Sequence, residues 1–385
     1  MKIIYILKSL AMTAGVERVM SDKMNWLAEH GYDITMVTYE QGQHPLVFPL
    51  HPSIRHIDLD TRFFSVKRYS YPIRLLMIWR MRHQFRNRLQ TFLDEISPDF
   101  IITTTYSIKL IDIILSVTTD ACRIIESHVA CCYIKKAFDF RRNFLLRTIA
   151  GSYDNMMLGK VAKADCLVTL TNGDATDWSI YTSNVIVIPN PVTYFPEAVK
   201  YRDGTGRRIL CVGRLDEQKG FDLLIDAFEL IADRCPGWKI DIFGDGSDKA
   251  MLLEKIKQKG LQNQMEINPP TSNIYDEYMR SDFFVLSSRY EGYPLVLNEA
   301  MSCGIPCVAF RCKYGPEDAI TDGVNGLLVE KGNIEDLANK ILWMITHTEE
   351  RLSMGVKARE AALRYKKDAI MNQWVGLFNR LMNNN

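Results

Sequence analysis

The sequence predicts an α/β protein with two doubly wound domains in tandem. Short apolar runs alternate with helix-length segments, which is the pattern of parallel strands joined by crossover helices. The pattern restarts in the second half of the chain, and 385 residues exceed what one hydrophobic core usually fills. We therefore expect an N-terminal domain over residues 1–195 and a C-terminal domain over residues 196–365.

The expected strands are short runs of β-branched and other apolar residues. In the first domain they cover residues 2–7, 33–38, 54–59, 100–105, 123–127, 166–170 and 185–188. In the second domain they cover residues 209–212, 239–243, 265–267, 283–287, 306–310 and 326–329. Runs that are apolar throughout, without alternation, indicate strands that helices cover on both faces.

The boundary between the two sets is a stretch that suits neither a helix nor a central strand. Ile188-Pro189-Asn190-Pro191-Val192 is followed by a polar, glycine-bearing segment over residues 201–208. Proline disrupts both kinds of element, so we place a linker near residue 195. At the C-terminus, residues 366–385 show the spacing of an amphipathic helix, which we expect to pack back on the first domain.

Composition and charge exclude several classes of protein. A hydrophobic fraction of 47% with 24% charged residues excludes a disordered or collagen-like chain. The 47 basic and 46 acidic residues nearly balance, so no overall positive field favours nucleic acid. Nine cysteines without CxxC pairs indicate reduced thiols in a cytoplasmic protein. No apolar run approaches the roughly 18 residues of a transmembrane helix, so we expect any membrane contact to be peripheral.

One stretch of the first domain is strongly basic. No acidic residue occurs between Asp60 and Asp94. The basic residues there are Arg62, Lys67, Arg68, Arg74, Arg80, Arg82, Arg86 and Arg88. They are interleaved with large apolar side chains, the mixture expected of a surface that meets anionic lipid headgroups. Contact of residues 62–88 with the inner face of the cytoplasmic membrane is one interpretation, and a solvated helix is the other.

The most specific motif covers residues 289–306, R-Y-E-G-Y-P-L-V-L-N-E-A-M-S-C-G-I-P. It follows a strand, turns at Gly292 and predicts a helix with Pro294 at its first position, where the missing amide hydrogen is harmless. Amides after Gly292 would form an anion site at the carboxyl edge of the sheet. Glu291 lies in the turn and Glu299 in the second helical turn, so their carboxylates could accept from different hydroxyls of one elongated ligand. Two solvated acids on an ordinary helix are the alternative.

A second motif follows the first strand of the C-terminal domain. Residues 212–220, V-G-R-L-D-E-Q-K-G, end that strand at Gly213 and place Arg214 and Lys219 in the next loop. A guanidinium can bind two phosphate oxygens side by side, and an ammonium supplies a point charge. The two cations could hold a diphosphate and stabilise it as a leaving group. Two solvated loop cations are the alternative.

With these motifs, the chain resembles a family-4 retaining glycosyltransferase of the GT-B architecture, in which two Rossmann-like domains face each other across a cleft. The hallmark of that family is two glutamates separated by seven residues, matched by Glu291 and Glu299. Residues 213–220 resemble its diphosphate-binding loop, and residues 315–329 resemble its next characteristic segment. Further matches, to its first glycine loop and its interdomain junction, are residues 14–19 and 188–192.

The resemblance implies a role for each motif residue. Arg214 and Lys219 would contact the diphosphate of a nucleotide-sugar donor. Glu299 would bind the ribose hydroxyls and Glu291 the transferred sugar. His128 follows a strand and would lie against the sugar, with a structural, hydrogen-bonded histidine as the alternative. The implied donor-binding residues also include Gly15, Gly213, Gly244, Gly292, Tyr293, Pro294, Leu295 and Val296.

The implied reaction is retaining transfer of a hexose or N-acetylhexosamine, with UDP as the expected carrier. The N-terminal domain would bind a saccharide or lipid-linked acceptor in polysaccharide, lipopolysaccharide or capsule biosynthesis. Front-face attack, with the departing phosphate assisting deprotonation, needs no nucleophile, and we expect no cofactor and no metal. Asp58-Leu59-Asp60 matches the DxD pattern of metal-dependent sugar transferases, but it is far from the other motifs in the sequence.

Two other functions remain open at this point. A GT-B nucleotide-sugar epimerase would turn over its donor without an acceptor. A catalytically silent GT-B scaffold subunit would be expected to have lost Arg214, Lys219 or the two glutamates, and all four are present.

Overall fold

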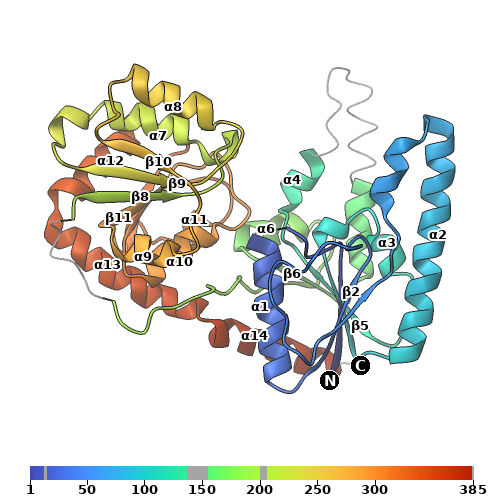
Figure 1. Ribbon diagram of the computed structural model, residues 1–385. Coiled ribbons are helices and arrows are strands. Elements are labelled where there is room, and N and C mark those ends of the chain that lie inside the picture. Colours follow the sequence, from blue (N-terminus) through green and yellow to red (C-terminus); the bar gives the residue numbers. More distant parts are fainter. Residues whose placement is uncertain (13–14, 137–154, 200–205, 384–385) are drawn as a thin grey trace. The chain divides into compact units, whose positions relative to one another are not determined.

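The computed structural model describes residues 1–12, 15–136, 155–199 and 206–383 (Figure 1). The chain divides into two compact units, residues 1–189 with 371–385, and residues 190–370. The junction falls within the proline-rich stretch that the sequence singles out, a few residues before the expected boundary at 195. Residues 200–205 of the expected linker lie outside the described residues.

The first unit is built on a parallel sheet, with described strands in the order β3-β2-β1-β4-β5-β6-β7. These strands are β1 (Lys2–Leu7), β2 (Asp33–Thr38), β3 (Arg55–Asp58), β4 (Phe100–Thr104), β5 (Cys122–Glu126), β6 (Cys166–Thr169) and β7 (Val185–Val187). In β1, an inner strand, Tyr5 pairs with Met36 of β2 and with Ile102 of β4. The side chains of Ile3 to Ile6 are completely buried, which explains why this run is apolar throughout.

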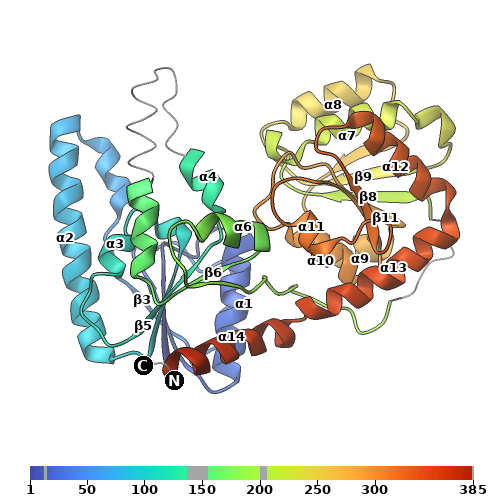
Figure 2. The same cartoon turned by 180° about the vertical axis from the view of Figure 1, so that it is seen from behind.

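Helices cover both faces of the first sheet, with α1 and α2 on opposite sides (Figures 1 and 2). The helical elements are α1 (Gly15–Glu29), η1 (Phe63–Arg68), α2 (Tyr71–Ile96), η2 (Thr105–Ser107), α3 (Ile111–Ile114), α4 (Cys131–Lys136), η3 (Lys160–Lys163) and α6 (Asn172–Trp178). Helix α2 packs one stripe of side chains, Phe85, Leu89 and Phe92, against the sheet. Most of its other residues are exposed or half-buried, so this helix covers the sheet with a narrow face.

The C-terminal helix α14 (Lys367–Asn383) packs its aromatic residues into the first unit. The ring of Phe378 lies 4.9 Å from Phe100 of β4 and 6.4 Å from Tyr32, measured between centroids. The ammonium of Lys23 lies 3.7 Å from the centre of the Trp374 ring. The last helix of the chain is therefore part of the core that the N-terminal strands form.

The second unit contains another parallel sheet, with described strands in the order β10-β9-β8-β11-β12-β13. These are β8 (Arg208–Val212), β9 (Lys239–Phe243), β10 (Met265–Asn268), β11 (Phe283–Leu286), β12 (Cys307–Phe310) and β13 (Gly326–Val329). The order reverses between β8 and β11. In open sheets of this kind, ligands bind outside the carboxyl ends of strands at such a switch point.

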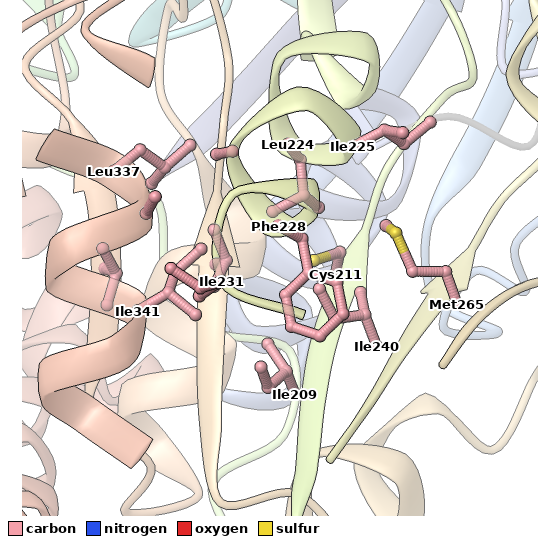
Figure 3. Close-up of a cluster of buried hydrophobic side chains, with 14 of the residues drawn as sticks. Ile209, Cys211, Leu224, Ile225, Phe228, Ile231, Ile240, Met265, Leu337 and Ile341 are labelled. Atoms are coloured by element: carbon pink, nitrogen blue, oxygen red, sulfur yellow. The ribbon is translucent and has the colours of Figure 1, made fainter. Parts of the chain in front are cut away.

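Two hydrophobic clusters cover the two faces of the second sheet. One face packs against α7 (Phe221–Glu229), α8 (Lys249–Gln258) and α12 (Ile334–Thr346), and Figure 3 shows Phe228 and Leu224 of α7 beside Ile209 and Cys211 of β8. The other face packs against α9 (Ile274–Met279), α10 (Leu295–Ser302), α11 (Pro316–Ala319) and α13 (Thr348–Ala362). Short 3-10 segments are η4 (Glu217–Lys219), η5 (Ala232–Arg234) and η6 (Leu363–Tyr365).

The prediction of an α/β fold with two doubly wound parallel sheets is confirmed. Each expected strand is present, with ends that differ by one residue at most. None of the nine cysteines, all of them among the described residues, forms a disulfide, and Cys132 alone is not buried. Among the described residues, no helix is long and apolar enough to cross a membrane.

Asp174, in the first turn of α6, is a buried carboxylate of the first unit. Its Oδ1 accepts from the amide of Cys131 at 2.8 Å, and its Oδ2 accepts from the hydroxyl of Ser127 at 2.7 Å. Burial raises the pKa of Asp174 to about 6, because these hydrogen bonds offset only part of the cost of desolvating the charge.

Replacing Asp174 with asparagine is expected to change how stability depends on pH. Folding raises the pKa of Asp174 from 3.8 to about 6, so the protonated side chain is favoured in the folded state. The resulting contribution to stability is fully present below pH 3.8 and is lost as the pH rises through 6. Relative to the wild type, Asp174→Asn should gain roughly 2–3 kcal/mol between about pH 4 and pH 7.5. Urea unfolding at both pH values tests this, and an unchanged difference in unfolding free energy would contradict it.

Candidate active site

The candidate site lies where the loops after β8, β9 and β11 meet at the carboxyl edge of the second sheet. Backbone hydrogen bonds connect these loops. The amide of Leu215 donates to the carbonyl oxygen of Asp245 at 2.9 Å, and the amide of Arg289 donates to the carbonyl oxygen of Gln218 at 2.8 Å. Gly213 and Gly244 also lie in these loops. Segments far apart in the sequence are thus held side by side before any ligand is considered.

Three glycines permit this close approach. A Cβ on Gly244 would lie 1.9 Å from the carbonyl oxygen of Gly213. Gly220 has a φ of +62°, and a Cβ there would lie 2.2 Å from the carbonyl oxygen of Ser287. A Cβ on Gly315 would lie 2.2 Å from the ring of Pro294. Any side chain at these positions would force the loops apart.

Lys219 and Glu291 form an ion pair at the centre of the site. Their Nζ and Oε1 atoms are 2.7 Å apart, and the side chains are only 14% and 5% exposed. The hydroxyl of Ser288 donates to the same Oε1 at 2.6 Å, whereas Oε2 meets no donor among the described residues. The lysine methylenes pass over Gly213, within 3.2 Å of where its Cβ would be. The sequence predicted both residues as ligand contacts but not that they would contact each other.

Arg214 is held much more loosely. Its side chain is 72% exposed, and its Nη2 lies 3.2 Å from Asp216 and 3.0 Å from the amide oxygen of Gln218. Gln218 in turn donates to the carbonyl oxygen of Tyr290 at 3.1 Å. The guanidinium is therefore connected to the loop that carries Glu291, yet most of its surface is open to solvent.

Glu299 is half-buried on the second turn of α10. The hydroxyl of Tyr278 donates to its Oε2 at 3.0 Å. Burial, and then the nearby Glu299 carboxylate, raise the pKa of Tyr278 well above its usual value. The tyrosine consequently stays protonated and keeps donating, which orients the carboxylate.

The start of α10 differs by one residue from the prediction. Pro294 has a ψ of 85° and caps the helix, which begins at Leu295, so its predicted place as first helical residue was wrong. The ring of Pro294 instead packs closely against Gly315, outside the helix. The amide of Leu295 donates to the carbonyl oxygen of Tyr293 at 3.0 Å and is not available to a ligand. In the described part of the chain, the amide of Val296 has no acceptor.

Two neighbours of this helix start have distinct roles. The hydroxyl of Tyr293 donates to the carbonyl oxygen of Asn190 at 3.2 Å and accepts from Asn298 at 2.6 Å, so this side chain supports the loop. Gly292 has no atom within 4 Å of a possible Cβ, and packing alone does not require a glycine there.

The other two predicted site residues belong to the first unit. Gly15 is exposed and begins α1, whereas Ala14 before it lies outside the described residues. The ring of His128 is completely buried, with its Nε2 3.1 Å from Oε2 of Glu126. That same oxygen accepts from Lys23 at 2.5 Å. In the described structure, Nδ1 of His128 is buried without a hydrogen-bond partner.

Lys23 and Glu126 are residues that the sequence analysis missed. Both are 1% exposed. Burial alone would raise the pKa of Glu126. The Lys23 cation and His128 lower it by more than burial raises it, so the net shift of the pKa is downward. Burial lowers the pKa of Lys23, and attraction to Glu126 opposes that shift. A lysine on the otherwise apolar face of Val19, Met20, Met24 and Leu27 was the available signal.

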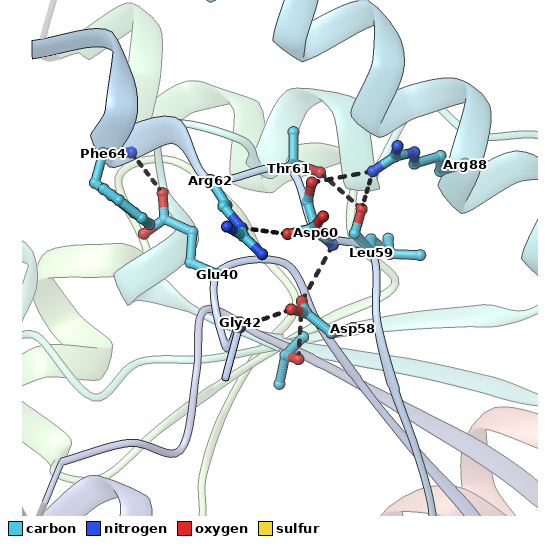
Figure 4. A network of polar contacts seen from close by, with 10 residues as sticks. Glu40, Gly42, Asp58, Leu59, Asp60, Thr61, Arg62, Phe64 and Arg88 are labelled. Carbon is cyan, nitrogen blue, oxygen red and sulfur yellow. Dashed lines mark hydrogen bonds and ion pairs between the residues drawn. The ribbon is translucent and has the colours of Figure 1, made fainter. Parts of the chain in front are cut away.

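Asp58 and Asp60, the residues of the DxD pattern, take part in a local network of the first unit (Figure 4). Asp58 accepts from the amides of Gly42 at 2.8 Å and Asp60 at 3.2 Å. Asp60 pairs with Arg62. These contacts brace the turn after β3, and no described group of acidic, histidine or cysteine side chains forms a metal site.

A comparison with protein families identifies the part of the chain that carries the main motifs. Residues 197–361 match the family model for glycosyl transferases group 1. This matched segment includes Lys219, Glu291 and helix α10. Gly15 and His128 lie outside it.

Two curated relatives align with nearly the whole chain. An uncharacterized glycosyltransferase of Haemophilus influenzae is 29% identical over 378 residues, which are 98% of this chain and 99% of that protein. The amylovoran biosynthesis glycosyltransferase AmsD of Erwinia amylovora is 26% identical over 385 residues, with the same two coverages.

Solved structures share the fold at low identity. The sucrose-phosphate synthase of Thermosynechococcus elongatus has a TM-score of 0.79 at 18% identity, with all of both chains covered. Anabaena Alr3699/HepE in complex with UDP has a TM-score of 0.73 at 17% identity, with 99% of this chain and all of that chain covered. The two units of this chain therefore have the fold of known GT-B structures.

Replacing Gly220 with alanine should separate the effect of the loop contact from that of backbone conformation. Gly260 has a similar φ of +71° but no atom within 4 Å of a possible Cβ, so Gly260→Ala is the matched control. The left-handed conformation alone should cost about 1–2 kcal/mol in either variant. Gly220→Ala must also displace the loop at Ser287, so its melting temperature should fall at least about twice as far. Equal decreases would show that the loop contact is not restrictive.

Proposed function

We propose that this protein is a retaining glycosyltransferase of family 4 that transfers a hexose or N-acetylhexosamine from a UDP-linked donor. The observation that carries this proposal is the buried contact of Lys219 with Glu291, beside the exposed Arg214 and the oriented Glu299. All four residues lie in the segment that matches the glycosyl transferases group 1 model. The two relatives that align over nearly the whole chain are also described as glycosyltransferases.

In this proposal, Arg214 and Lys219 bind the donor diphosphate. Arg214 can turn toward a phosphate because only Asp216 and Gln218 restrain it. Lys219 has three ammonium hydrogens, and the contact with Glu291 uses one of them. As the bond between sugar and phosphate breaks, negative charge accumulates on the diphosphate. Cations already in position would stabilise that charge without reorganising.

The two glutamates would bind the uncharged parts of the donor. Glu299, oriented by Tyr278, would accept from the ribose hydroxyls. Glu291 would use its Oε2, which has no donor among the described residues, to accept from a sugar hydroxyl. The UDP complex of the Anabaena protein, which has the same fold, supports UDP as the carrier.

Retention would follow from attack on the same face as the departing phosphate. Glu291 is paired with Lys219 and bonded to Ser288, so its role here is to bind the sugar rather than to form a covalent intermediate. An oxygen of the departing phosphate would take the proton of the acceptor hydroxyl. This mechanism assigns no step to a metal ion. His128 in the first unit is proposed to face the sugar through its unpartnered Nδ1.

The acceptor is proposed to be a saccharide or lipid-linked saccharide bound by the first unit. The similarity to AmsD, an amylovoran biosynthesis glycosyltransferase, supports a role in polysaccharide biosynthesis. Neither an epimerase nor a silent scaffold protein is supported by the comparisons.

We also propose that residues 62–88 bind the anionic inner face of the cytoplasmic membrane. Five large apolar side chains at the start of α2 are exposed, namely Tyr71, Ile73, Leu75, Leu76 and Trp79. Arg80 and Arg86 on the same helix are exposed as well. Apolar side chains that enter the headgroup layer, beside arginines that attract it, are typical of peripheral membrane helices.

Removing the exposed cation should abolish most of the transfer and leave the fold intact. Arg214→Ala should lower kcat by about 100-fold or more, because the diphosphate loses a charge-assisted contact in the transition state. The control is Arg280→Ala, at the residue that caps the C-terminal end of α9; its side chain is 61% exposed, and the variant should retain wild-type turnover. The assay measures release of UDP from a panel of UDP-sugars with membrane extract as acceptor source, and a chelator should not reduce the rate.

A second variant tests the ribose contact. Glu299→Gln keeps the shape and the hydrogen bond from Tyr278 but removes the charge, so affinity for UDP should fall about tenfold. Wild-type turnover in Arg214→Ala together with wild-type UDP affinity in Glu299→Gln would refute the proposed function.

Reversing the charge of the exposed arginines on α2 tests the membrane proposal. Arg80→Glu with Arg86→Glu should reduce flotation with vesicles that contain anionic lipid by about tenfold or more, at roughly 1 kcal/mol per basic residue. Arg280→Glu, in the second unit, is the control. Equal flotation of the wild type with neutral and anionic vesicles would contradict electrostatic binding.

A further inference from the structure

A cavity of about 460 Å³ lies in the first unit. Its walls come from the ends of β1 and β2, from η1, from one face of α2 and from residues 106–110 after β4. Nothing in the proposed donor site uses it. All of its lining residues belong to the first unit, so it can be described independently of the second.

The lining of this cavity combines apolar surface with positive charge. The apolar part includes Tyr39, Phe63, Val66, Ile78, Ile108 and Leu110. The cations are Lys8, Lys67, Arg82 and Lys109. Glu40, the one carboxylate among the described lining residues, is 3.4 Å from Lys8 and accepts from the amide of Phe64 at 3.1 Å. The cavity therefore has a net positive lining and a carboxylate that is already engaged.

The walls are fixed by contacts within the first unit. Figure 4 shows Glu40 at the end of β2 reaching the backbone of Phe64, which holds η1 in place. The hydroxyls of Tyr39 and Ser107 lie 2.9 Å apart and are buried. Arg82 donates to the carbonyl oxygen of Lys109 at 2.6 Å and pairs with Asp112 at 2.6 Å. These contacts connect β2, η1, α2 and the 106–110 segment, and they fix the walls around the cavity.

An apolar path leads from the cavity to the exposed start of α2. Leu75, Ile78 and Arg82 are spaced at three and four residues, so they share one face of the helix. Ile78 and Arg82 line the cavity, whereas Leu75, one turn toward the N-terminus, is exposed. Phe64 and Tyr106 line the cavity and are also largely exposed. A ligand could therefore occupy the cavity and continue along an apolar surface.

This combination indicates what kind of ligand fits. Sugars are usually bound by amides and carboxylates that accept from hydroxyl groups, but the described residues of the lining include no asparagine, glutamine or aspartate. Lysine and arginine side chains next to aliphatic and aromatic walls suit an anionic group attached to a hydrocarbon chain. Phosphate is the anion that such clusters of cations favour.

We propose that this cavity binds the phosphate or diphosphate that joins the lipid to the sugar of a membrane-borne acceptor. The lipid chain would lie along Leu75 and Phe64 and continue toward the membrane. The proposal rests on the proposed function for its biological meaning, since it narrows the acceptor to a lipid-linked phosphosaccharide. It concerns a binding site of its own, so it can be tested without any transfer reaction.

The test measures binding of a simple anionic amphiphile to the full chain. Decyl phosphate below its micelle concentration is titrated by calorimetry and compared with inorganic phosphate and with decyl maltoside. Decyl phosphate should bind at least about tenfold more tightly than either, because it alone offers both the anion and the apolar chain. Similar binding of inorganic phosphate, or of decyl maltoside, would overturn the proposal in favour of a plain anion site or a plain apolar groove.

Matched variants locate the site. Lys67→Glu reverses an exposed lining charge, and Ile78→Ser removes an apolar wall; each should weaken decyl phosphate binding by about tenfold. Lys163→Glu makes the same charge change on an exposed lysine of the first unit that lies outside both the lining and residues 62–88, and it should change binding less than about twofold. Equal losses in Lys67→Glu and Lys163→Glu would show an effect of general surface charge and overturn the proposal.

A titration with UDP separates this proposal from the proposed function. The proposed UDP contacts Arg214, Lys219 and Glu299 belong to the second unit, so Lys67→Glu should keep wild-type UDP affinity. An unchanged melting temperature shows that this variant is folded. Binding of decyl phosphate without binding of UDP would leave the cavity proposal standing and refute the donor site. Binding of UDP without binding of decyl phosphate would do the reverse.

Discussion

The ion pair of Lys219 and Glu291 is the interaction on which the candidate site depends. It joins the loops after β8 and β11 across a distance of 2.7 Å, with both side chains largely removed from water. Removing one partner would leave the other charge buried and unpaired, which is costly, so neither residue can change alone. The pair also holds the Lys219 ammonium in place at the sheet edge, because its Nζ is bound to a carboxylate that Ser288 anchors as well.

Close backbone contacts make this ion pair geometrically possible. Gly244 contacts the carbonyl of Gly213, and Gly220 contacts the carbonyl of Ser287, so neighbouring loops approach more closely than any side chain would permit. The lysine methylenes then cross over Gly213, where a Cβ would crowd them. Gly213, Gly220 and Gly244 thus fix the separation of the loops, and the charged side chains use the space that results.

The sequence predicted the strands closely because central parallel strands are apolar on both faces, and such runs are recognisable without any knowledge of their partners. It also predicted that Arg214, Lys219, Glu291 and Glu299 would share one sheet edge. It did not predict that Lys219 and Glu291 would pair, nor that Lys23 would be buried against Glu126. Partners that are 72 and 103 residues apart are decided by loop geometry and helix rotation, which local patterns do not encode.

His128 shows why such a network matters for function. The low pKa of Glu126, maintained by Lys23, keeps an anion beside Nε2 of the imidazole, so that nitrogen is the one that carries hydrogen. In the described structure, Nδ1 is then left as a buried nitrogen without a partner. A buried polar atom of this kind is costly unless a ligand or water satisfies it. Lys23 and Glu126 therefore orient the ring of His128 from inside the core, and the proposed contact with the sugar would supply the partner that its Nδ1 lacks.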